Sequence, residues 1–332
     1  MNIKDKAIIV TGGLGFIGSN LIAALEKKGY GNIVVVDYFG CDEKWKNVAK
    51  RNNILTYINP DNLFQEIENF KHPILSVIHL GAISSTTEKN VDLVIRTNYD
   101  LSFKLYCWCS THKISFIYAS SASVYGNAIS FHDSQSLRGI ENLRPLNAYG
   151  WSKKIFDSKV ARNNGFCNGV NQVVGLRFFN VYGPNEYHKG NQSSVILHFY
   201  NQLMADKDIK LFKSIDPAIS DGEQMRDFVY VDDCTSVIIW MLEHPEVSGL
   251  FNVGTGVARS YNDVAKIVMA MLNRQYKIDY IEMPYNLITQ YQNFTQAEID
   301  KLRKVGYNEA FRPIENGIKT YINILKQREY YI

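Results

Sequence analysis

The sequence lacks the features of a membrane protein or a disulfide-stabilised protein. Its 332 residues include only five cysteines, an odd number without C-x-x-C spacing, which argues against a disulfide framework and a zinc site. No apolar run reaches the roughly 18 residues that a membrane span needs. The first residues, MNIKDKAIIVTGG, lead into a strand pattern without a cleavage site of small residues. We therefore predict free thiols, no metal, no membrane contact and a cytoplasmic protein.

An excess of one charge is also lacking. The formal net charge is +3, and no block of Lys and Arg alternates with aromatic residues as in a platform for single-stranded nucleic acid. We therefore predict no nucleic-acid partner. The apolar content of 46% is typical of globular proteins. A chain of 332 residues is long for one simple core, and a prior of about 150 residues per domain predicts two lobes.

Short apolar runs rich in β-branched residues alternate with helical patterns in the first half of the chain. The strand-like runs are residues 7–12, 33–37, 54–58, 76–80, 115–120 and 172–178. Helical patterns lie between most of them, for example at residues 18–29 and 91–109. Strands that are apolar on both faces and alternate with helices indicate a parallel sheet covered on two sides. The sequence therefore predicts an α/β fold with a doubly wound parallel sheet of the Rossmann type.

The regular alternation of strand-like and helical patterns ends after about Val181. Segments become shorter and more polar, and a long loop follows at residues 213–227. A strand–helix unit returns at residues 228–242, and residues 250–256 have the pattern of one more sheet strand. We therefore predict a dinucleotide-binding domain of residues 1–180 with returning segments at about 228–262. A smaller, interleaved α/β substrate-binding lobe then comprises residues 181–227 and 263–332.

A glycine pattern follows the first predicted strand. The stretch TGGLGFIGSN places Gly12, Gly15 and Gly18 between a strand and a helix. Glycines let the backbone turn sharply and approach a pyrophosphate, which the helix N-terminus then binds. Asp37 ends the next strand, where a carboxylate can hold a ribose hydroxyl of NAD. Lys44 could offset the repulsion between Asp37 and a 2′-phosphate, so we name NADP as cofactor and keep NAD open.

Serine, tyrosine and lysine stand where such sheets carry their chemistry. Tyr149 and Lys153 in NAYGWSKK are four residues apart, and on a helix they share one face. Ser121 in YASSASVYG lies at the carboxyl end of a predicted strand. A cation at ~4 Å supplies about 4 kcal/mol at an effective dielectric constant of ~20, enough to lower a tyrosine pKa by about three pH units. We therefore expect Lys153 to make Tyr149 a base, with Ser121 holding the substrate oxygen.

Several stretches resemble a known superfamily. The glycine pattern, SSASVYG, the Y-x-x-x-K pair, Asn98 in RTNYD and RFFNVYGP resemble the extended short-chain dehydrogenases/reductases. HLGAISSTTE, FFNVYGPNEYHKG, MRDFVYVDD and YQNFTQAEIDKLRKVGY are similar to the ADP-glyceromanno-heptose 6-epimerase family within it. The resemblance runs from about Ala7 to Ile324 and departs at residues 40–60 and 215–225.

This resemblance implies an activity. The expected reaction inverts C6 of the heptose in ADP-D-glycero-D-manno-heptose and gives the L-glycero isomer, a step in lipopolysaccharide inner-core synthesis. A carbinol carbon has no acidic hydrogen, so the inversion needs transient hydride transfer to bound NAD(P) and its return to the opposite face. The resemblance implies Tyr149 and Lys189 as the two acid/bases, although on its own Lys189 reads as a solvated loop lysine. It also implies a homo-oligomer, a pentamer in relatives.

The resemblance implies two sets of ligand contacts as well. The cofactor contacts are Gly12, Gly15, Phe16, Ile17, Gly18, Asp37, Tyr38, Lys44, Leu80, Gly81, Ala82, Asn98, Lys153, Val181 and Lys189. The substrate contacts are Ser84, Asn180, Asn191, His198, Phe212, Arg226 and Tyr291. In this set we expect the planar guanidinium of Arg226 to bind a diphosphate with two hydrogen bonds and the ring of Phe212 to lie against adenine. The same residues also fit purely structural roles. Phe212 and Tyr291 could be core aromatics, His198 a hydrogen-bonded histidine, and Arg226 a member of a loop ion pair.

Other functions fit part of the pattern. A nucleotide-sugar 4-epimerase would use Ser121, Tyr149 and Lys153 without Lys189. A 4,6-dehydratase is disfavoured because it needs acidic groups where the chain has Ala122 and Ser123. A regulator that senses the dinucleotide without turnover is disfavoured because both the tyrosine and the lysine are present.

Overall fold

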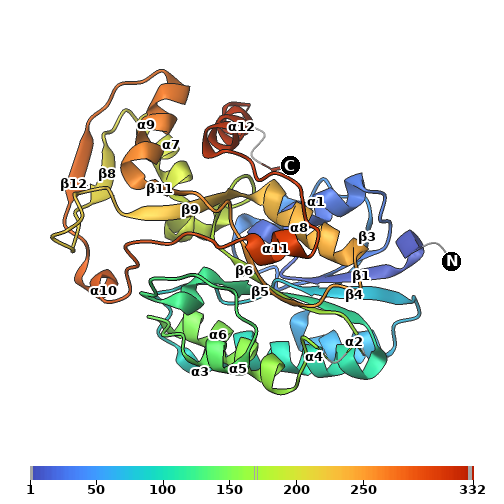
Figure 1. Ribbon diagram of the computed structural model, residues 1–332. Coiled ribbons are helices and arrows are strands. Elements are labelled where there is room, and N and C mark those ends of the chain that lie inside the picture. Colours follow the sequence, from blue (N-terminus) through green and yellow to red (C-terminus); the bar gives the residue numbers. More distant parts are fainter. Residues whose placement is uncertain (1–2, 168, 170, 328–330) are drawn as a thin grey trace.

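A seven-stranded parallel sheet forms the centre of the protein (Figure 1). The computed structural model describes residues 3–167, 169, 171–327 and 331–332. The strands of the sheet are β1 (Ala7–Thr11), β2 (Ile33–Val36), β3 (Ile54–Ile58), β4 (Ile74–His79), β5 (Ser115–Ser121), β6 (Val173–Phe178) and β10 (Gly249–Val253). They lie in the order β10-β6-β5-β4-β1-β2-β3. All seven predicted runs form these strands, so the predicted doubly wound sheet is confirmed.

Both faces of this sheet are buried under helices. Ile8 and Val10 of β1 belong to a core with α1 (Phe16–Lys27) and α8 (Val231–Glu243). Ala7 and Ile9 belong to a second core on the opposite face. The helices of that face are α2 (Leu63–Glu68), α3 (Val91–Ile95), α4 (Leu101–His112), α5 (Leu137–Glu141) and α6 (Ala148–Arg162) (Figure 1). Because side chains alternate between two apolar cores, each strand reads as a continuous apolar run.

The strand order reverses beside β1. The chain passes from β1 outward to β2 and β3 and then crosses back to β4, on the other side of β1. The loops that follow β1 and β4 therefore run to opposite faces of the sheet. In open α/β sheets this divergence leaves a crevice at the carboxyl edge, where ligands bind.

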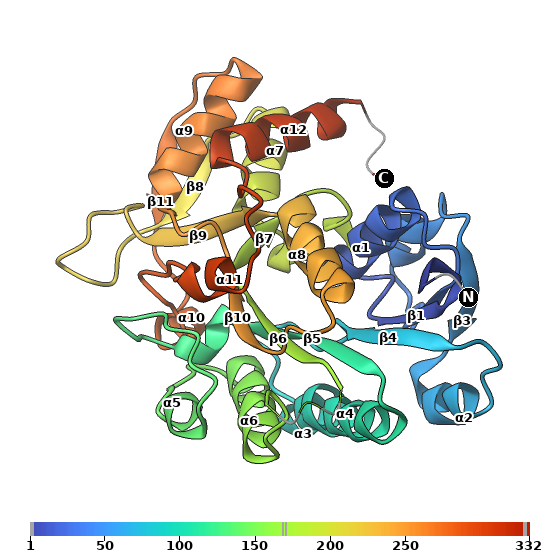
Figure 2. The same ribbon diagram turned by 45° about the vertical axis from the view of Figure 1, so that its right-hand side comes forward.

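A second group of elements has its own core. Its strands are β7 (Asn180–Tyr182), β9 (Met225–Tyr230) and β11 (Ala258–Ser260) in one sheet and β8 (Ile209–Phe212) with β12 (Ile278–Ile281) in another. Its helices are α7 (Val195–Met204), α9 (Tyr261–Leu272) and α12 (Ile314–Lys326). Phe199, Val268 and Ile318 join these helices in one apolar cluster. Figure 2 shows this group on the side of the sheet away from α2, α4 and α6. We call it the second lobe.

The two parts of the protein are interleaved along the chain. Within residues 228–262, α8 and β10 join the layers of the large sheet, whereas most of β9 and the whole of β11 belong to the second lobe. The short helix α10 (Tyr285–Ile288) precedes the long return of the chain to α11 (Asp300–Lys304), which lies against β10. The residue limits of the two predicted domains stay a prediction.

The predicted helix over residues 91–109 contains a change of helix type. It consists of α3, a π-helical turn η4 (Arg96–Asp100) and α4 in direct succession. π-helical turns inside helices are often found at functional sites. Here the turn carries Asn98, which is fully buried.

Two findings concern the described residues as a whole. No helix among residues 3–167, 169, 171–327 and 331–332 is long and apolar enough to span a membrane. The same part of the chain contains no cluster of three or more His, Cys, Asp or Glu residues arranged to hold a metal ion.

A buried ion pair joins β6 to α6. Arg177 and Asp157 are both completely buried, and the guanidinium Nη2 lies 3.1 Å from a carboxylate oxygen. Asp157 also accepts hydrogen bonds from the hydroxyls of Tyr118 and Ser120, each at 2.9 Å. Arg177 donates to the Tyr125 hydroxyl at 3.1 Å. Every polar group of this network has a partner, which is the condition under which a buried pair is tolerated.

We predict that Arg177→Met destabilises the fold by about 3–5 kcal/mol, since removing one partner leaves an uncompensated buried charge. Urea unfolding followed by circular dichroism measures this loss. The matched control Arg162→Met breaks an exposed pair with Glu141 and should cost less than about 1 kcal/mol. Equal losses in the free energy of unfolding of the two variants would show that the buried pair contributes no more to stability than the exposed pair.

Candidate active site

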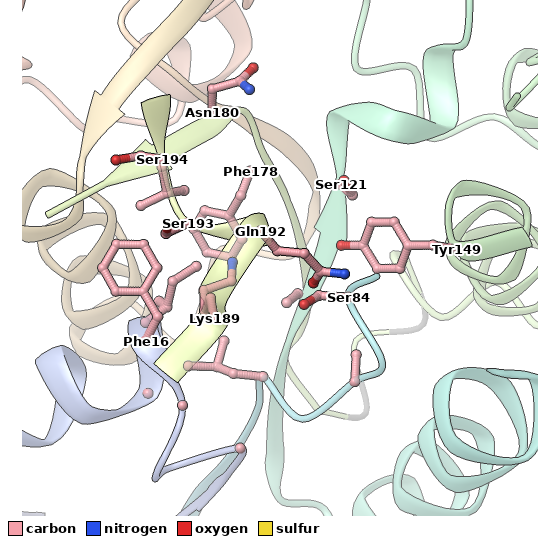
Figure 3. A pocket seen from close by; sticks show the side chains of 18 of the residues that line it. Phe16, Ser84, Ser121, Tyr149, Phe178, Asn180, Lys189, Gln192, Ser193 and Ser194 are labelled. Atoms are coloured by element: carbon pink, nitrogen blue, oxygen red, sulfur yellow. The ribbon is translucent and has the colours of Figure 1, made fainter. Parts of the chain in front are cut away.

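A cavity of about 640 Å³ lies at the carboxyl edge of the large sheet. Residues that follow β1, β4, β5 and β6 form one side of it, and residues of β7, η6 (Tyr187–Gln192) and α7 form the other (Figure 3). Its volume is that of a site for a nucleotide-sized ligand. The predicted residues that line it are Gly12, Gly15, Phe16, Ile17, Gly18, Asp37, Lys44, Leu80, Gly81, Ala82, Ser84, Ser121, Tyr149, Lys153, Asn180, Val181 and Lys189.

The glycine turn has no room for side chains. Gly12 has φ +68°, and a Cβ there would lie 2.6 Å from the Gly81 backbone nitrogen. A Cβ on Gly18 would lie 2.2 Å from the Gly12 carbonyl oxygen. Helix α1 begins here, and its N-cap residue Gly15 has no side chain that could satisfy the free N–H groups. The turn therefore presents a close-packed backbone and a positive helix end to the cavity, as a pyrophosphate requires.

Asp37 and Lys44 form an ion pair at one end of the cavity. The Lys44 ammonium lies 3.1 Å from Asp37 Oδ1, and Asp37 Oδ2 accepts a hydrogen bond from the Leu14 N–H at 3.0 Å. Both side chains also line the cavity. The carboxylate is therefore held in place and partly neutralised, which leaves it able to accept from a ribose hydroxyl. Tyr38 lies outside the cavity, and its hydroxyl donates to Asp61 at 2.6 Å.

Tyr149 and Lys153 project from the first two turns of α6. Asn147 caps this helix by accepting from the Gly150 N–H at 2.8 Å. Lys153 is 3% exposed, and its ammonium donates to the Ala119 carbonyl of β5 at 2.8 Å. Ser121 at the end of β5 is also buried. The three residues of the predicted Ser–Tyr–Lys group therefore lie in one cavity at the carboxyl edge of the sheet, the place that the sequence predicts.

The electrostatics of this group differ from the expectation. Burial raises the pKa of Tyr149, and the hydroxyl of Ser121 is the group that opposes this rise. Burial also lowers the pKa of Lys153 to about 8, while Asp157, one helical turn further along, acts in the opposite direction. The predicted lowering of the Tyr149 pKa by Lys153 is not seen in this structure. Loss of water around both groups outweighs the charge of the lysine.

Lys189 enters the cavity from the short helix η6. Gly190 follows it with φ +53°, which ends the turn in a kink. The Lys189 ammonium lies 5.7 Å from the centre of the Phe16 ring, and burial lowers its pKa against the opposing charge of Glu186. In Figure 3, Lys189 and Tyr149 point into the cavity from facing walls. The two predicted acid/bases therefore share one cavity.

Asn98 supports the cavity from behind. Its side chain donates to the Ile83 carbonyl at 3.0 Å and accepts from the Ile83 N–H at 2.8 Å. It thus pins the loop that carries Ala82 and Ser84, both of which line the cavity. Asn98 does not line the cavity itself.

The other predicted substrate residues lie around the cavity without lining it. Nε2 of His198 lies 3.3 Å from the hydroxyl of Ser193, a lining residue. The guanidinium carbon of Arg226 lies 5.0 Å from the Tyr291 ring centre and 5.7 Å from that of Tyr261, another lining residue. Two further predicted residues are Phe212, half-buried at the end of β8, and Asn191, exposed at the end of η6. The roles of this set stay predictions.

Several lining residues escaped the sequence analysis. They are Asp42, Thr86, Ala119, Phe178, Phe179, His188, Gln192, Ser193, Ser194, Val195, Phe228 and Tyr261. One signal was available, since Ser194 precedes an apolar helical run and caps α7 by accepting from the Leu197 N–H. In Figure 3 the amide of Gln192 reaches toward Ser84 and Tyr149.

The family of the chain follows from comparison with known proteins. Residues 8–254 match the NAD dependent epimerase/dehydratase family, and the chain belongs to that family. A nicotinamide dinucleotide is accordingly its cofactor, and the glycine turn, the open end of α1 and Asp37 fit that group.

Curated relatives narrow this assignment. An ADP-L-glycero-D-manno-heptose-6-epimerase of Alkalilimnicola ehrlichii is 44% identical over 95% of this chain and 96% of its own. The enzyme of that name from Fusobacterium nucleatum is 40% identical over 98% of this chain and 100% of its own. Within its family the chain thus groups with the ADP-L-glycero-D-manno-heptose-6-epimerases.

Solved structures agree. The ADP-L-glycero-D-manno-heptose-6-epimerase of Helicobacter pylori is 32% identical, with a TM-score of 0.82 over 98% of this chain and 97% of its own. A UDP-N-acetylglucosamine 4-epimerase of Methanobrevibacter ruminantium has the same TM-score of 0.82 at 24% identity, over 98% of this chain and 99% of its own. The latter likeness shows the shared fold.

We predict that Lys153 makes the stability of the protein depend on pH. Its pKa falls from 10.5 to about 8 on folding, so the unfolded chain binds this proton more tightly than the folded protein. The resulting penalty of about 3 kcal/mol is complete below pH 8 and is relieved as the pH rises toward 10.5. The free energy of unfolding of the wild type minus that of Lys153→Met should therefore rise across this range in urea titrations.

The control for this prediction is Lys213→Met. Lys213 is fully exposed beside Glu282, which raises its pKa, so its difference curve should not rise between pH 8 and 10.5. A flat curve for Lys153→Met would show that burial of the ammonium carries no cost.

Proposed function

We propose that the protein interconverts ADP-D-glycero-D-manno-heptose and its L-glycero isomer by inverting C6 of the heptose. The observation that carries this proposal is that Lys189 and Tyr149 face one cavity, which the glycine turn also lines. The high identity to heptose epimerases over nearly the whole chain supports it.

The reaction needs two proton-transfer groups because the substrate oxygen changes its position. The glycine turn and Asp37 would hold a nicotinamide dinucleotide, which would supply the hydride acceptor for oxidation at C6 and the hydride donor for reduction of the ketone. During oxidation, the base on one wall takes the hydroxyl proton. During reduction, the acid on the other wall gives a proton to the ketone oxygen. The sum of both steps is an isomerisation without net redox change.

The protonation of Tyr149 and Lys189, on the two walls of the cavity, suits this proton exchange. Burial favours the neutral form of both groups, since it raises the pKa of Tyr149 and lowers that of Lys189. A neutral amine accepts a proton and a neutral phenol donates one, so the neutral pair serves one direction of the epimerisation. The ammonium and phenolate that this leaves serve the reverse direction. Ser121 holds the substrate oxygen beside Tyr149, and Lys153 holds a cofactor hydroxyl and orients the tyrosine.

We propose the second lobe as the binding site of the ADP-heptose, made of the predicted residues 181–227 and 263–332 together with β11 and the end of β9. Arg226 supports this assignment, because it is 6% exposed, lies against the rings of Tyr261 and Tyr291 and donates to the Met225 carbonyl. A diphosphate would give its free N–H groups charge-assisted partners. The family resemblance alone supports a cytoplasmic homo-oligomer, pentameric as in relatives, that serves lipopolysaccharide inner-core synthesis.

We predict that Lys189→Ala and Tyr149→Phe each reduce turnover by about 10²–10⁴-fold, the usual contribution of one acid/base group. The assay incubates the purified protein with each ADP-heptose isomer and determines the sugar configuration by NMR. Both variants should keep the circular dichroism and melting temperature of the wild type, because neither side chain holds the fold together. Lys213→Ala, at an exposed position, is the matched lysine control. Normal turnover of the lysine variant would remove Lys189 from the mechanism.

We propose NADP as the preferred cofactor, because Lys44 neutralises the carboxylate that would repel a 2′-phosphate. Lys44→Ala should weaken NADP binding by roughly ten- to a hundredfold, which is the worth of one charge-assisted hydrogen bond. Binding of NAD should change far less. Quenching of protein fluorescence by each cofactor measures both affinities. An equal loss for the two cofactors would instead assign Lys44 a purely structural role.

A further inference from the structure

Glu186 is a buried carboxylate one turn before Lys189. The side chain is 1% exposed. Among the described residues, no ion pair within 4 Å includes it. A buried charge without a direct counter-ion is costly and is usually retained for a reason. The mechanism above gives Glu186 no part.

The carboxylate of Glu186 holds the start of α7. It accepts hydrogen bonds from the backbone N–H of Ser194 and, at 2.7 Å, from the Ser194 hydroxyl. Burial raises the pKa of this carboxylate, and Ser194 and Tyr321 on α12 are among the groups that oppose the rise. Lys189 lies between the two joined residues, 186 and 194, and its N–H donates to the Glu186 carbonyl at 3.0 Å. The turn that carries Lys189 is therefore closed by Glu186.

The other end of this turn is anchored on the glycine-turn side. Asn20 at the start of α1 donates to the Pro184 carbonyl at 2.9 Å. Asn185 donates to the Ser19 hydroxyl at 3.0 Å, and it has φ +69°. The chain before Glu186 is thus fixed to α1, and the chain after Lys189 is fixed through Ser194.

Charged and titratable groups surround this turn on every side. They are Tyr187 and His188 on η6, Asp37, Asp42 and Lys44 from the β2 side, His198 on α7, Tyr230 on β9 and Tyr321 on α12. Burial disfavours the ammonium form of Lys189, and the carboxylate of Glu186 favours it. Burial and, in turn, the charge of Lys189 lower the pKa of His188.

We propose that Glu186 is a positioning residue for Lys189: its buried carboxylate closes the turn onto Ser194 and places a negative charge behind the amine. The inference rests on the proposed function, in which Lys189 exchanges a proton with the substrate. An amine that must be a base in one direction and an acid in the other needs both forms within reach. Burial favours the neutral amine, and the charge of Glu186 favours the ammonium form.

The central experiment is the substitution Glu186→Gln, which keeps an acceptor for Ser194 and removes the charge. The amine of Lys189 is titrated by competitive acetylation between pH 6 and 11, with mass spectrometry of the peptide that contains it. This readout needs neither substrate nor turnover. Loss of the negative charge should move the labelling midpoint of Lys189 to lower pH. The limb of the kcat–pH profile that Lys189 governs should move in the same direction.

Two variants separate charge from structure. Ser194→Ala removes the 2.7 Å hydrogen bond and keeps the charge, so its Lys189 midpoint should stay at the wild-type pH. Glu282→Gln is a matched loss of charge beside the exposed Lys213, at 2.6 Å. It should lower the midpoint of Lys213 and leave that of Lys189 unchanged.

An unchanged Lys189 midpoint in folded Glu186→Gln overturns the proposal. Where that variant does not fold, Glu186→Asp provides the test, since it retains a charge but is one methylene too short to hold Ser194. Its kcat should fall by about a hundredfold, the loss that a misplacement of about 1 Å produces, with KM within about twofold. A wild-type kcat in this variant overturns the proposal as well. Normal turnover of Lys189→Ala would instead refute the proposed mechanism, whatever the midpoints show.

Discussion

The active site depends on the exclusion of water from charged side chains at the carboxyl edge of the sheet. Lys153 and Lys189 are both withdrawn from solvent by the elements that cover the cavity, and burial lowers the pKa of each. Each lysine has a buried carboxylate about one turn away, Asp157 for the first and Glu186 for the second, that opposes this effect. Burial around the cavity thus influences the protonation of both amines. A more open cavity would solvate both amines and hold them as ordinary ammonium ions.

The sequence predicts well what short-range patterns determine. Apolar runs mark the strands of the large sheet, because a strand that is covered on both faces has no polar face to interrupt the pattern. The edge strand β3 shows such a run as well, although its Leu55 and Tyr57 are exposed. The turn from Gly12 to Gly18 is equally local, because each glycine is required by a backbone atom a few residues or one strand away. Tyr149 and Lys153 share a face of α6 through helix geometry alone. Local patterns are therefore sufficient to place these residues correctly.

Contacts between distant segments were not predictable in this way. Gln192 and Tyr261 line the cavity because the second lobe folds back over the sheet. The sequence around these two residues does not indicate that they come close to the sheet. The strands β7, β9 and β11 that bring the lobe there are separated by long stretches of chain. The predicted shift of the Tyr149 pKa was also wrong in direction, because a sequence shows the neighbouring lysine but not how much water the fold removes. Distances along a helix are local, whereas burial is a property of the whole molecule.

The two lysines differ in how firmly the fold holds them. Lys153 sits on a fifteen-residue helix and is tied to β5 through the Ala119 carbonyl, so its position is fixed by the core of the sheet. Lys189 sits on a six-residue turn that is interrupted by a kink at Gly190, and such a turn has little stability of its own. Its place is set by hydrogen bonds at its two ends, of which those of Glu186 are charged and buried. The position of Lys153 thus follows from the core of the sheet, whereas the position of Lys189 depends on a few hydrogen bonds at the ends of a short turn. The same pairing of a buried amine with a carboxylate about one turn away therefore stands on a rigid support in the helix and on a weaker one in the turn.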